Sequence, residues 1–390
     1  MRTTGSGWCA QPVRRATVAP AGRSRSMVLT VCSGPGATEH QAPSPRGAEH
    51  QASTPRATEG PAVDPIALAA VDEVEITTLV DNSFDGLLPS YAGVARPSSR
   101  AAGVPSPLFE GGRTRVGMVA EHGFSALVTV GRAGSRSTLL FDTGVSPEGM
   151  ATNAERLGID FSGLRGVVLS HGHYDHAGGF DGLLRLRRRR GLPLTVHPAV
   201  WTRRRVLLPG ADASELPTLS KGALAREGFE VVERRVPSLL VDACVLITGE
   251  VDRTTEFERG MPRSHEAWDG GTWRHDPLVV DDQALVVHLA GRGLVVLTGC
   301  GHAGVVNIVR HAMRLTGVDR LVAVIGGFHL GGSAFEPIIG PTVAALQELR
   351  PDLVVAGHCT GWRAQHALAA ALPGAWVPSS AGSSYRLEAA

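Results

Sequence analysis

The sequence predicts an α/β (α+β) protein in which two β-sheets pack face to face and helices cover the outer faces, an αβ/βα layered sandwich. Strand-like segments are followed by alternating helices and strands, and this succession occurs twice along the chain. Hydrophobic residues make up 43% and charged residues 19% of the 390 residues, a composition that can form a large buried core.

Residues 1–72 differ in composition from the rest of the chain, because they are rich in Ala, Pro, Ser, Thr, Gly and Arg. They contain an imperfect repeat, in which the segment 39–46 returns at 49–56. Such a segment cannot bury enough apolar surface to offset the entropy lost on ordering. We therefore predict a disordered low-complexity tail, either dispensable or added by a start codon assigned too early, and one domain over 73–390.

The first half of this domain alternates apolar and polar residues as strands do. Strands are expected at 74–81, 113–122, 124–131, 137–141 and 166–169. A helix is expected at 147–158, and a second helix follows the last strand and ends in the arginine run 185–190. That run is typical of a solvated last helical turn, and a nucleic-acid-binding patch is the less favoured interpretation.

The second half repeats the alternation of strands and helices. Strands are expected at 283–288, 293–297, 320–325 and 353–356, and helices at 303–316, 340–349 and 361–372. Between the two halves, the stretch of about 198–280 has weaker patterning. We expect it to form an insertion near the mouth of the site, where binding loops usually lie.

Four potential metal ligands follow the predicted strand 166–169 within six residues. They are His171, His173, Asp175 and His176, and imidazole nitrogen and carboxylate oxygen are ligands that zinc and similar ions prefer. In extended backbone, His171 and His173 point to the same side and can bind one ion together. Asp175 and His176 follow after the chain turns and can serve a second ion. The sequence therefore predicts a metal site here.

Two ions need further ligands, which must come from the ends of later strands. Three histidines follow apolar strands there, namely His302, His329 and His358. Each of them could instead be an ordinary packed core histidine, and His329 could also hydrogen-bond to a metal ligand without binding the ion itself. Cys300 and Cys359 are possible thiolate ligands, although a small buried thiol is the commoner outcome.

The segment His171–His176 resembles the HxHxDH signature of the metallo-β-lactamase superfamily, and Phe141–Gly144 resembles the Asp-bearing loop that precedes it. Six further segments resemble one branch, the proteins similar to 7,8-dihydropterin-6-methyl-4-(β-D-ribofuranosyl)aminobenzene-5′-phosphate synthase. They are 79–82, 121–125, 281–285, 298–304, 325–330 and 358–361. The resemblance covers about residues 74–390 and implies the four-layer αβ/βα sandwich of the superfamily.

The resemblance also implies two metal positions. It matches His171, His173 and His302 to the first ion, and Asp175, His176 and His358 to the second. The strand that usually ends in a metal-bridging Asp ends here in Thr298-Gly299-Cys300. If Cys300 is not a ligand, His329 could complete the second position.

The favoured function is metal-assisted hydrolysis of an ester, phosphoester or similar bond in a small-molecule substrate. A bound Zn²⁺ ion lowers the pKa of its water toward about 7, and Asp175 would act as the catalytic residue that accepts the proton or orients the water. One or two Zn²⁺ ions are expected, and Fe or Mn could take the same ligands. The resemblance implies an alternative, a synthase (transferase) that uses a pyrophosphate-activated dihydropterin. A nuclease or a non-catalytic metal-binding protein is less favoured.

Composition disfavours several other classes of function. A net charge of +1 provides no field that would steer the protein to nucleic acid or to an anionic membrane. The five cysteines are widely spaced without a CxxC pair, which indicates a reducing compartment. No run of about 18 apolar residues occurs. We expect a cytoplasmic protein that binds neither membranes nor nucleic acid, and the sequence leaves its oligomeric state open.

Overall fold

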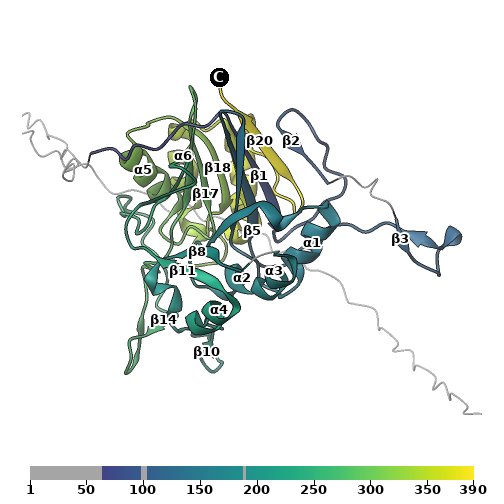
Figure 1. Ribbon diagram of the computed structural model, residues 1–390. Helices are drawn as coiled ribbons and strands as arrows, with labels where there is room; N and C mark the ends of the chain where they lie inside the picture. Colours follow the sequence, from purple (N-terminus) through teal and green to yellow (C-terminus); the bar gives the residue numbers. More distant parts are fainter. Residues whose placement is uncertain (1–63, 98–102, 188–189) are drawn as a thin grey trace, which may run out of the picture. The chain divides into compact units, whose positions relative to one another are not determined.

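The computed structural model describes residues 64–97, 103–187 and 190–390, and every structural statement below refers to this part of the chain. Two large sheets dominate it (Figure 1). The first has eight strands, in the spatial order β11 (Phe229–Glu233), β8 (Leu192–Val196), β7 (Leu164–Val168), β6 (Ser135–Phe141), β5 (Ser125–Arg132), β1 (Glu73–Val80), β20 (Ser384–Glu388) and β2 (Val94–Ala95). The second has six, in the order β12 (Ser238–Leu240), β13 (Val245–Ile247), β16 (Leu285–Leu289), β17 (Gly293–Thr298), β18 (Leu321–Gly327) and β19 (Leu353–Gly357).

Helices cover the outer face of each sheet. Against the first sheet pack α1 (Gly149–Leu157), α3 (Phe180–Leu186) and α4 (Lys221–Glu227). Against the second pack α5 (Val305–Thr316), α6 (Ile339–Leu349) and α7 (Trp362–Ala371). None of these helices is long and apolar enough to cross a membrane.

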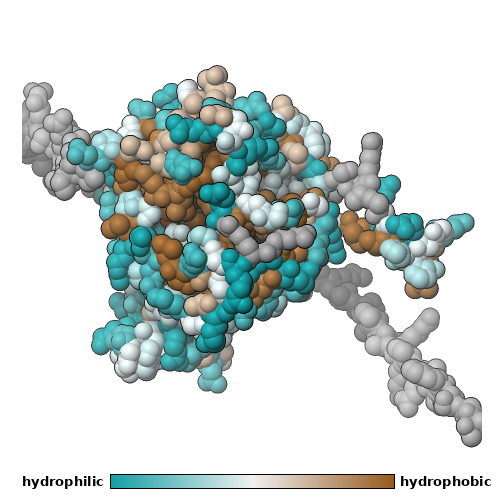
Figure 2. Space-filling model, in the orientation of Figure 1, coloured by the Kyte–Doolittle hydropathy of each residue, from teal (hydrophilic) through white to brown (hydrophobic). Residues whose placement is uncertain are grey.

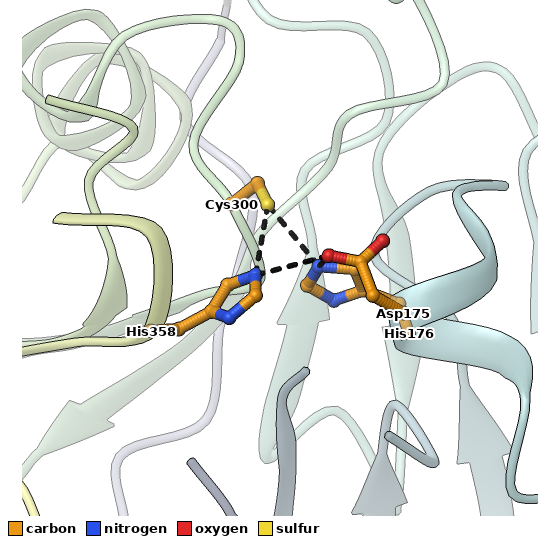
Figure 3. Close-up of side chains that lie close together, drawn as sticks. All are labelled: Asp175, His176, Cys300 and His358. Carbon is orange, nitrogen blue, oxygen red and sulfur yellow. Dashed lines mark hydrogen bonds and ion pairs between the residues drawn. The ribbon is translucent and has the colours of Figure 1, made fainter. Parts of the chain in front are cut away.

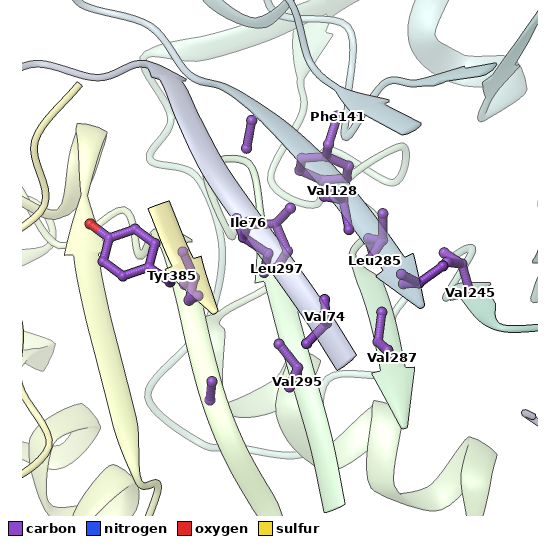
Figure 4. Close-up of a cluster of buried hydrophobic side chains, with 14 of the residues drawn as sticks. Val74, Ile76, Val128, Phe141, Val245, Leu285, Val287, Val295, Leu297 and Tyr385 are labelled. Atoms are coloured by element: carbon purple, nitrogen blue, oxygen red, sulfur yellow. The ribbon is translucent and has the colours of Figure 1, made fainter. Parts of the chain in front are cut away.

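Strand alternation divides the apolar residues among three cores. In β17, Val295 and Leu297 belong to the central core between the sheets, whereas Val296 belongs to the outer core under the helices. In β6, Phe141 faces the central core and Leu140 the outer core. Successive side chains of a strand point to opposite faces, so one apolar strand contacts both layers. Figure 4 shows the central core, to which both sheets contribute. The predicted αβ/βα sandwich is confirmed.

The direction of the strands brings their carboxyl ends together. β6 and β7 are parallel neighbours in the first sheet, and β17, β18 and β19 are parallel neighbours in the second. Parallel strands end at the same edge of their sheet, where ligands bind in open α/β sheets. The HxHxDH segment follows β7, and His302, His329 and His358 follow β17, β18 and β19.

Several predicted boundaries need correction. Residues 64–72, predicted as tail, pack on the domain: the Ile66 amide donates to the Leu315 carbonyl, and Val71 is fully buried. The packed region therefore begins before residue 73, because these residues include apolar side chains that the domain buries. The rest of the predicted tail, residues 1–63, lies outside the described residues.

The stretch 198–280 is not one insertion. Its middle supplies β11 to the first sheet and β12 and β13 to the second, because their apolar residues complete the edges of both sheets. Only its two ends form a separate four-stranded sheet, made of β10 (Ser214–Glu215), β9 (Arg204–Val206), β14 (His265–Trp268) and β15 (Trp273–His275).

The strand expected at 113–122 is limited to β4 (Arg113–Thr114), which pairs with β3 (Val104–Pro105) in a short hairpin. Between these strands the side chains of Leu108 and Phe109 are exposed, and hydrophobic surface is visible on the hairpin at the right of Figure 2. The prediction of a strand over 113–122 is therefore wrong beyond Arg113–Thr114.

Candidate metal centre

The HxHxDH segment leaves β7 in extended backbone and then turns into the short helix α2 (Tyr174–Ala177). His173 is the N-cap of this helix, with extended dihedral angles, and Asp175 and His176 lie within it. The rings of His171 and His173 therefore lie side by side, with their centroids 4.6 Å apart, while Asp175 and His176 reach a neighbouring position. Both the pairing and the turn agree with the prediction from spacing.

The first group of donor atoms consists of three imidazoles. His302 Nε2 lies 3.2 Å from His171 Nε2 and 3.1 Å from His173 Nδ1, and all three residues are buried. Nitrogens bound to zinc at about 2.0–2.1 Å in a tetrahedral arrangement lie about 3.4 Å from one another. Three buried nitrogens that converge at nearly this spacing fit one divalent cation.

The protonation state of these imidazoles also suits a cation. Burial, together with the neighbouring histidines, lowers the pKa of each of His171, His173 and His302 well below its usual range. Arg204 adds to the effect at His171 and His173. The rings are therefore neutral at neutral pH. A neutral imidazole offers the lone pair that a metal ion requires.

The second group contains Asp175, His176, Cys300 and His358, all of them buried (Figure 3). Cys300 Sγ lies 3.1 Å from His176 Nε2 and 3.2 Å from His358 Nε2. Asp175 Oδ2 lies 3.3 Å from His358 Nε2 and 3.6 Å from His176 Nε2. Cys300 thus occupies the place at which the resemblance led us to expect a carboxylate.

The charges of this second group reinforce one another. Burial alone would raise the pKa of Asp175, but His176 and His358 lower it well below its usual range. Burial would likewise lower the pKa of His176, but Asp175 and Asp142 raise it to about 9. Without a cation, the group therefore contains a carboxylate paired with an imidazolium. A divalent ion that takes the place of the His176 proton would find the Asp175 carboxylate already ionised.

Polar side chains behind the ligands fix the orientation of the rings. The Asp142 carboxylate accepts hydrogen bonds from the Ser170 hydroxyl (2.7 Å) and pairs with His176 Nδ1 (2.7 Å). The Ser170 hydroxyl also lies 2.9 Å from His171 Nδ1, so it connects the two donor groups. Asn82 Oδ1 lies 3.1 Å from His358 Nδ1. Such partners set the tautomer and direction of metal-binding imidazoles.

His265 is a member of the site that the sequence did not reveal. Its Nε2 lies 3.1 Å from His173 Nε2, and its Nδ1 lies 3.1 Å from the Asp276 carbonyl oxygen. It reaches the centre from β14, in the small sheet, and no local motif marks it. His265 lies among residues without a clear helix or strand pattern, so only its being a histidine could have marked it as a site residue.

Three residues at these strand ends have strained backbone conformations. Asp142, His329 and His358 have positive φ angles of 59°, 45° and 44°, a conformation that is uncommon for residues other than glycine. Such strain persists where the surrounding structure determines the position of a side chain, and it clusters at functional sites. Here it directs three side chains toward one centre.

All the metal-ligand residues predicted from the sequence lie in one buried region. His171, His173 and His302 form one group, and Asp175, His176 and His358 another. His329 belongs to neither; it adjoins His302, with ring centroids 4.3 Å apart, and groups with Cys300 and Cys359.

A cavity of about 550 Å³ opens beside the donor groups. His302 and His329 line its inner end, and Phe257, Phe328 and Phe335 are among the residues of its apolar walls. Its volume lies in the range of small-molecule sites.

Comparisons with known proteins agree with this fold. The family model described as the metallo-beta-lactamase superfamily matches residues 120–311. A crystal structure of a metal-dependent hydrolase of the β-lactamase superfamily is 28% identical in sequence and superposes with a TM-score of 0.58, covering 81% of this chain and 99% of that chain. Both findings support the resemblance of the chain to the metallo-β-lactamase superfamily, in sequence over residues 120–311 and in fold over most of the chain.

The chain is also similar to 7,8-dihydropterin-6-methyl-4-(β-D-ribofuranosyl)-aminobenzene-5′-phosphate synthase of Methanocaldococcus jannaschii. The two are 29% identical over 253 residues, which are 63% of this chain and 83% of the relative. An uncharacterized protein of the same organism is 27% identical over 248 residues, 63% of this chain and 86% of that relative. The resemblance to this branch, inferred from the separate motifs, is confirmed.

Proposed function

We propose that the protein is a metal-dependent hydrolase that cleaves an ester, phosphoester or similar bond of a small-molecule substrate. The observation that carries this proposal is the pair of adjoining donor groups, each buried and each drawn from both halves of the fold. The first consists of three neutral imidazoles, and the second adds a carboxylate and a thiol. Buried polar groups without a ligand are costly, which makes such a constellation improbable as mere packing.

We assign the residues as follows: His171, His173 and His302 hold one ion, and Asp175, His176, Cys300 and His358 hold a second. A bound divalent ion, Zn²⁺ or alternatively Fe or Mn, would polarise the scissile bond and lower the pKa of water toward about 7. Asp175 is ionised because its pKa is low, so its carboxylate would help to hold the ion and would orient a water molecule. Asp142 and Asn82 hold the imidazoles in place for this step.

The cavity beside His302 supports a small-molecule substrate with a flat apolar part. Phe335 meets the His329 ring edge to face, with centroids 4.4 Å apart and an interplanar angle of 83°. Such walls contact flat rings well. Arg259 and Glu256 also line the cavity and supply charge for polar substituents.

The second candidate is a synthase that joins a pyrophosphate-activated dihydropterin to an aryl partner and releases pyrophosphate. The similarity to the Methanocaldococcus enzyme named above favours it. The same donor groups would serve a pyrophosphate leaving group instead of a scissile ester. The three thiols of the described region are free, and they support a reducing compartment, the cytoplasm, as the place of either reaction.

Metal content of the full-length protein tests the metal centre that both candidates need. We expect at least two equivalents of metal in the wild type and a loss of about one in His171→Ala and in His358→Ala, as a two-metal site requires. His275→Ala is the control, because His275 contacts the Met261 carbonyl in the small sheet, outside the donor groups. Unchanged metal content in His171→Ala would refute the assignment.

Substrate turnover then separates the two candidates. Hydrolysis of model phosphoesters, lactones or thioesters that disappears in His171→Ala supports the hydrolase. Pyrophosphate release from a dihydropterin pyrophosphate that requires the aryl partner supports the synthase and overturns the hydrolase.

A further inference from the structure

A third cluster of ligand atoms adjoins the two donor groups and remains without a role in the reaction above. It consists of Cys300, His329 and Cys359, whose donor atoms all lie within 4.8 Å of one another. Cys300 is shared with the second group, whereas His329 and Cys359 belong to neither group.

Not every polar atom of this cluster has a hydrogen-bond partner among the described residues. His329 Nδ1 is buried and has no hydrogen-bond partner among the described residues. The Cys359 thiol donates a long contact of 3.4 Å to the Cys300 carbonyl, which is weak because thiols are poor donors. A buried nitrogen without a partner is unfavourable. One ring nitrogen of His329 therefore has no partner, while the ring also interacts with the Cys359 side chain.

The fold brings these side chains together at a cost. Cys300, His329 and Cys359 follow the adjacent parallel strands β17, β18 and β19. His329 adopts a positive φ of 45°, a strained conformation for a residue other than glycine. At Gly327, the Cβ of any larger residue would lie 2.8 Å from Cys359 Sγ, so only glycine leaves this thiol its space.

We propose that Cys300, His329 and Cys359 bind a further thiophilic divalent cation, with Cys300 shared between this ion and that of the second group. Two sulfurs and one imidazole form a donor set that favours soft or borderline ions such as Zn²⁺ over Mg²⁺ or Ca²⁺. Each thiol releases its proton to solvent on binding. The proposal rests on the proposed function only through the shared Cys300.

This position also adjoins the substrate cavity. Three protein ligands leave a fourth position of a tetrahedral ion open, and His329 lines the inner end of the cavity beside Gly301. The open position therefore serves a thiolate or oxyanion group of a molecule in that cavity. We assign the third ion a role in binding the substrate, separate from the chemistry of the first two.

Zinc-loaded full-length protein provides the test, with no need for a substrate. X-ray absorption separates sulfur neighbours at about 2.3 Å from nitrogen neighbours at about 2.0–2.1 Å. Elemental analysis gives the zinc content. We expect Cys359→Ser and His329→Ala each to lose one zinc equivalent, and we expect the sulfur signal to fall in Cys359→Ser.

Cys244→Ser is the matched control, because Cys244 is a free, buried thiol in the central core away from the donor clusters. It should keep the zinc content and the sulfur signal of the wild type. Wild-type levels of zinc and sulfur in both Cys359→Ser and His329→Ala would overturn the proposal.

The X-ray absorption spectrum of the wild type tests the proposal even if the variants fail to fold. Zinc surrounded by nitrogen and oxygen alone in the wild type would refute the third position while leaving the three-histidine group intact. Failure of the proposed function has a different signature, namely unchanged zinc content in His171→Ala. The two proposals can therefore fail separately.

Discussion

A buried ion pair beneath the HxHxDH segment should control both the stability of the domain and its metal affinity. Arg204, in β9, pairs with Asp281 through two guanidinium nitrogens and with Asp276 at 3.0 Å. The side chain of Asp281 is fully buried and that of Arg204 is 3% exposed. Asp281 Oδ2 also accepts a hydrogen bond of 2.7 Å from the amide of Gly172, which lies between the two histidines of the first donor group.

We predict that Arg204→Met destabilises the protein by about 3–5 kcal/mol, because it leaves the Asp281 carboxylate buried without its partner. For a unit of the length of Gly60–Ala390, the entropy of unfolding is about 0.7 kcal/mol/K, so the thermal midpoint should fall by about 4–7 °C. The midpoint is measured by circular dichroism with a chelator present, because bound metal would add its own stabilisation.

Two further variants make this prediction specific. Arg203→Met removes the neighbouring ion pair with Glu215, in which both side chains are about half exposed, and should cost at most about 1 kcal/mol. Arg204→Met combined with Asp281→Asn should recover part of the loss, since the fully buried charge of Asp281 is then absent. A midpoint for Arg204→Met within 1 °C of that for Arg203→Met would refute the reasoning.

Three further predictions concern the surroundings of the donor groups. Asp142→Asn removes the carboxylate behind His176 and should weaken the second ion about 10–100-fold, as chelator competition would show, while an unchanged affinity would contradict our account of that contact. His265→Ala should weaken the first ion by about 10-fold through its contact with His173; equal affinities in this variant and in His275→Ala would argue against such positioning. Gly299→Ala should lower the thermal midpoint because the new Cβ would overlap the Ser170 hydroxyl. At Gly340 a new Cβ would meet no atom within 4 Å, so Gly340→Ala should stabilise α6 by up to about 1 kcal/mol. A similar midpoint for both variants would contradict the predicted overlap.

Much of the site could be predicted because its ligands follow apolar strands. The density of His171, His173, Asp175 and His176 after one such strand indicates a metal site without any knowledge of the fold. His302, His329 and His358 could be named as candidates because the carboxyl ends of parallel strands meet at one edge of a sheet, and the resemblance to the superfamily led us to choose His302 and His358 among them.

The rest of the site depends on contacts that no local pattern encodes. His265 reaches His173 only because β14 pairs with β9 in the small sheet, across a separation of 92 residues. For Cys300, the sequence left open a ligand or an inert thiol. The structure places its sulfur between His176 and His358, a matter of side-chain direction.

Two strands were not predicted, because their pairing is likewise not encoded in a local sequence pattern. β8 contains Pro193, which cannot donate to a ladder, yet its remaining residues pair with β7 and β11 on either side. β20, at the end of the chain, pairs with β1 near the beginning, and its exposed and half-buried residues give little apolar signal. Conversely, none of the residues 113–122 is buried, and only Arg113–Thr114 form a strand.

The origin of the ligands has a consequence for stability. In each of the first two donor groups, some residues follow β7 in the first sheet, and the others follow β17 or β19 in the second. An ion held by such a group therefore joins the two halves of the sandwich at one edge, in addition to the apolar core between the sheets. Because metal binding to the native state alone is folding free energy, metal should raise the thermal midpoint of both halves together. A substitution in either half, His171→Ala or His358→Ala, should remove part of that gain while leaving the metal-free midpoint nearly unchanged.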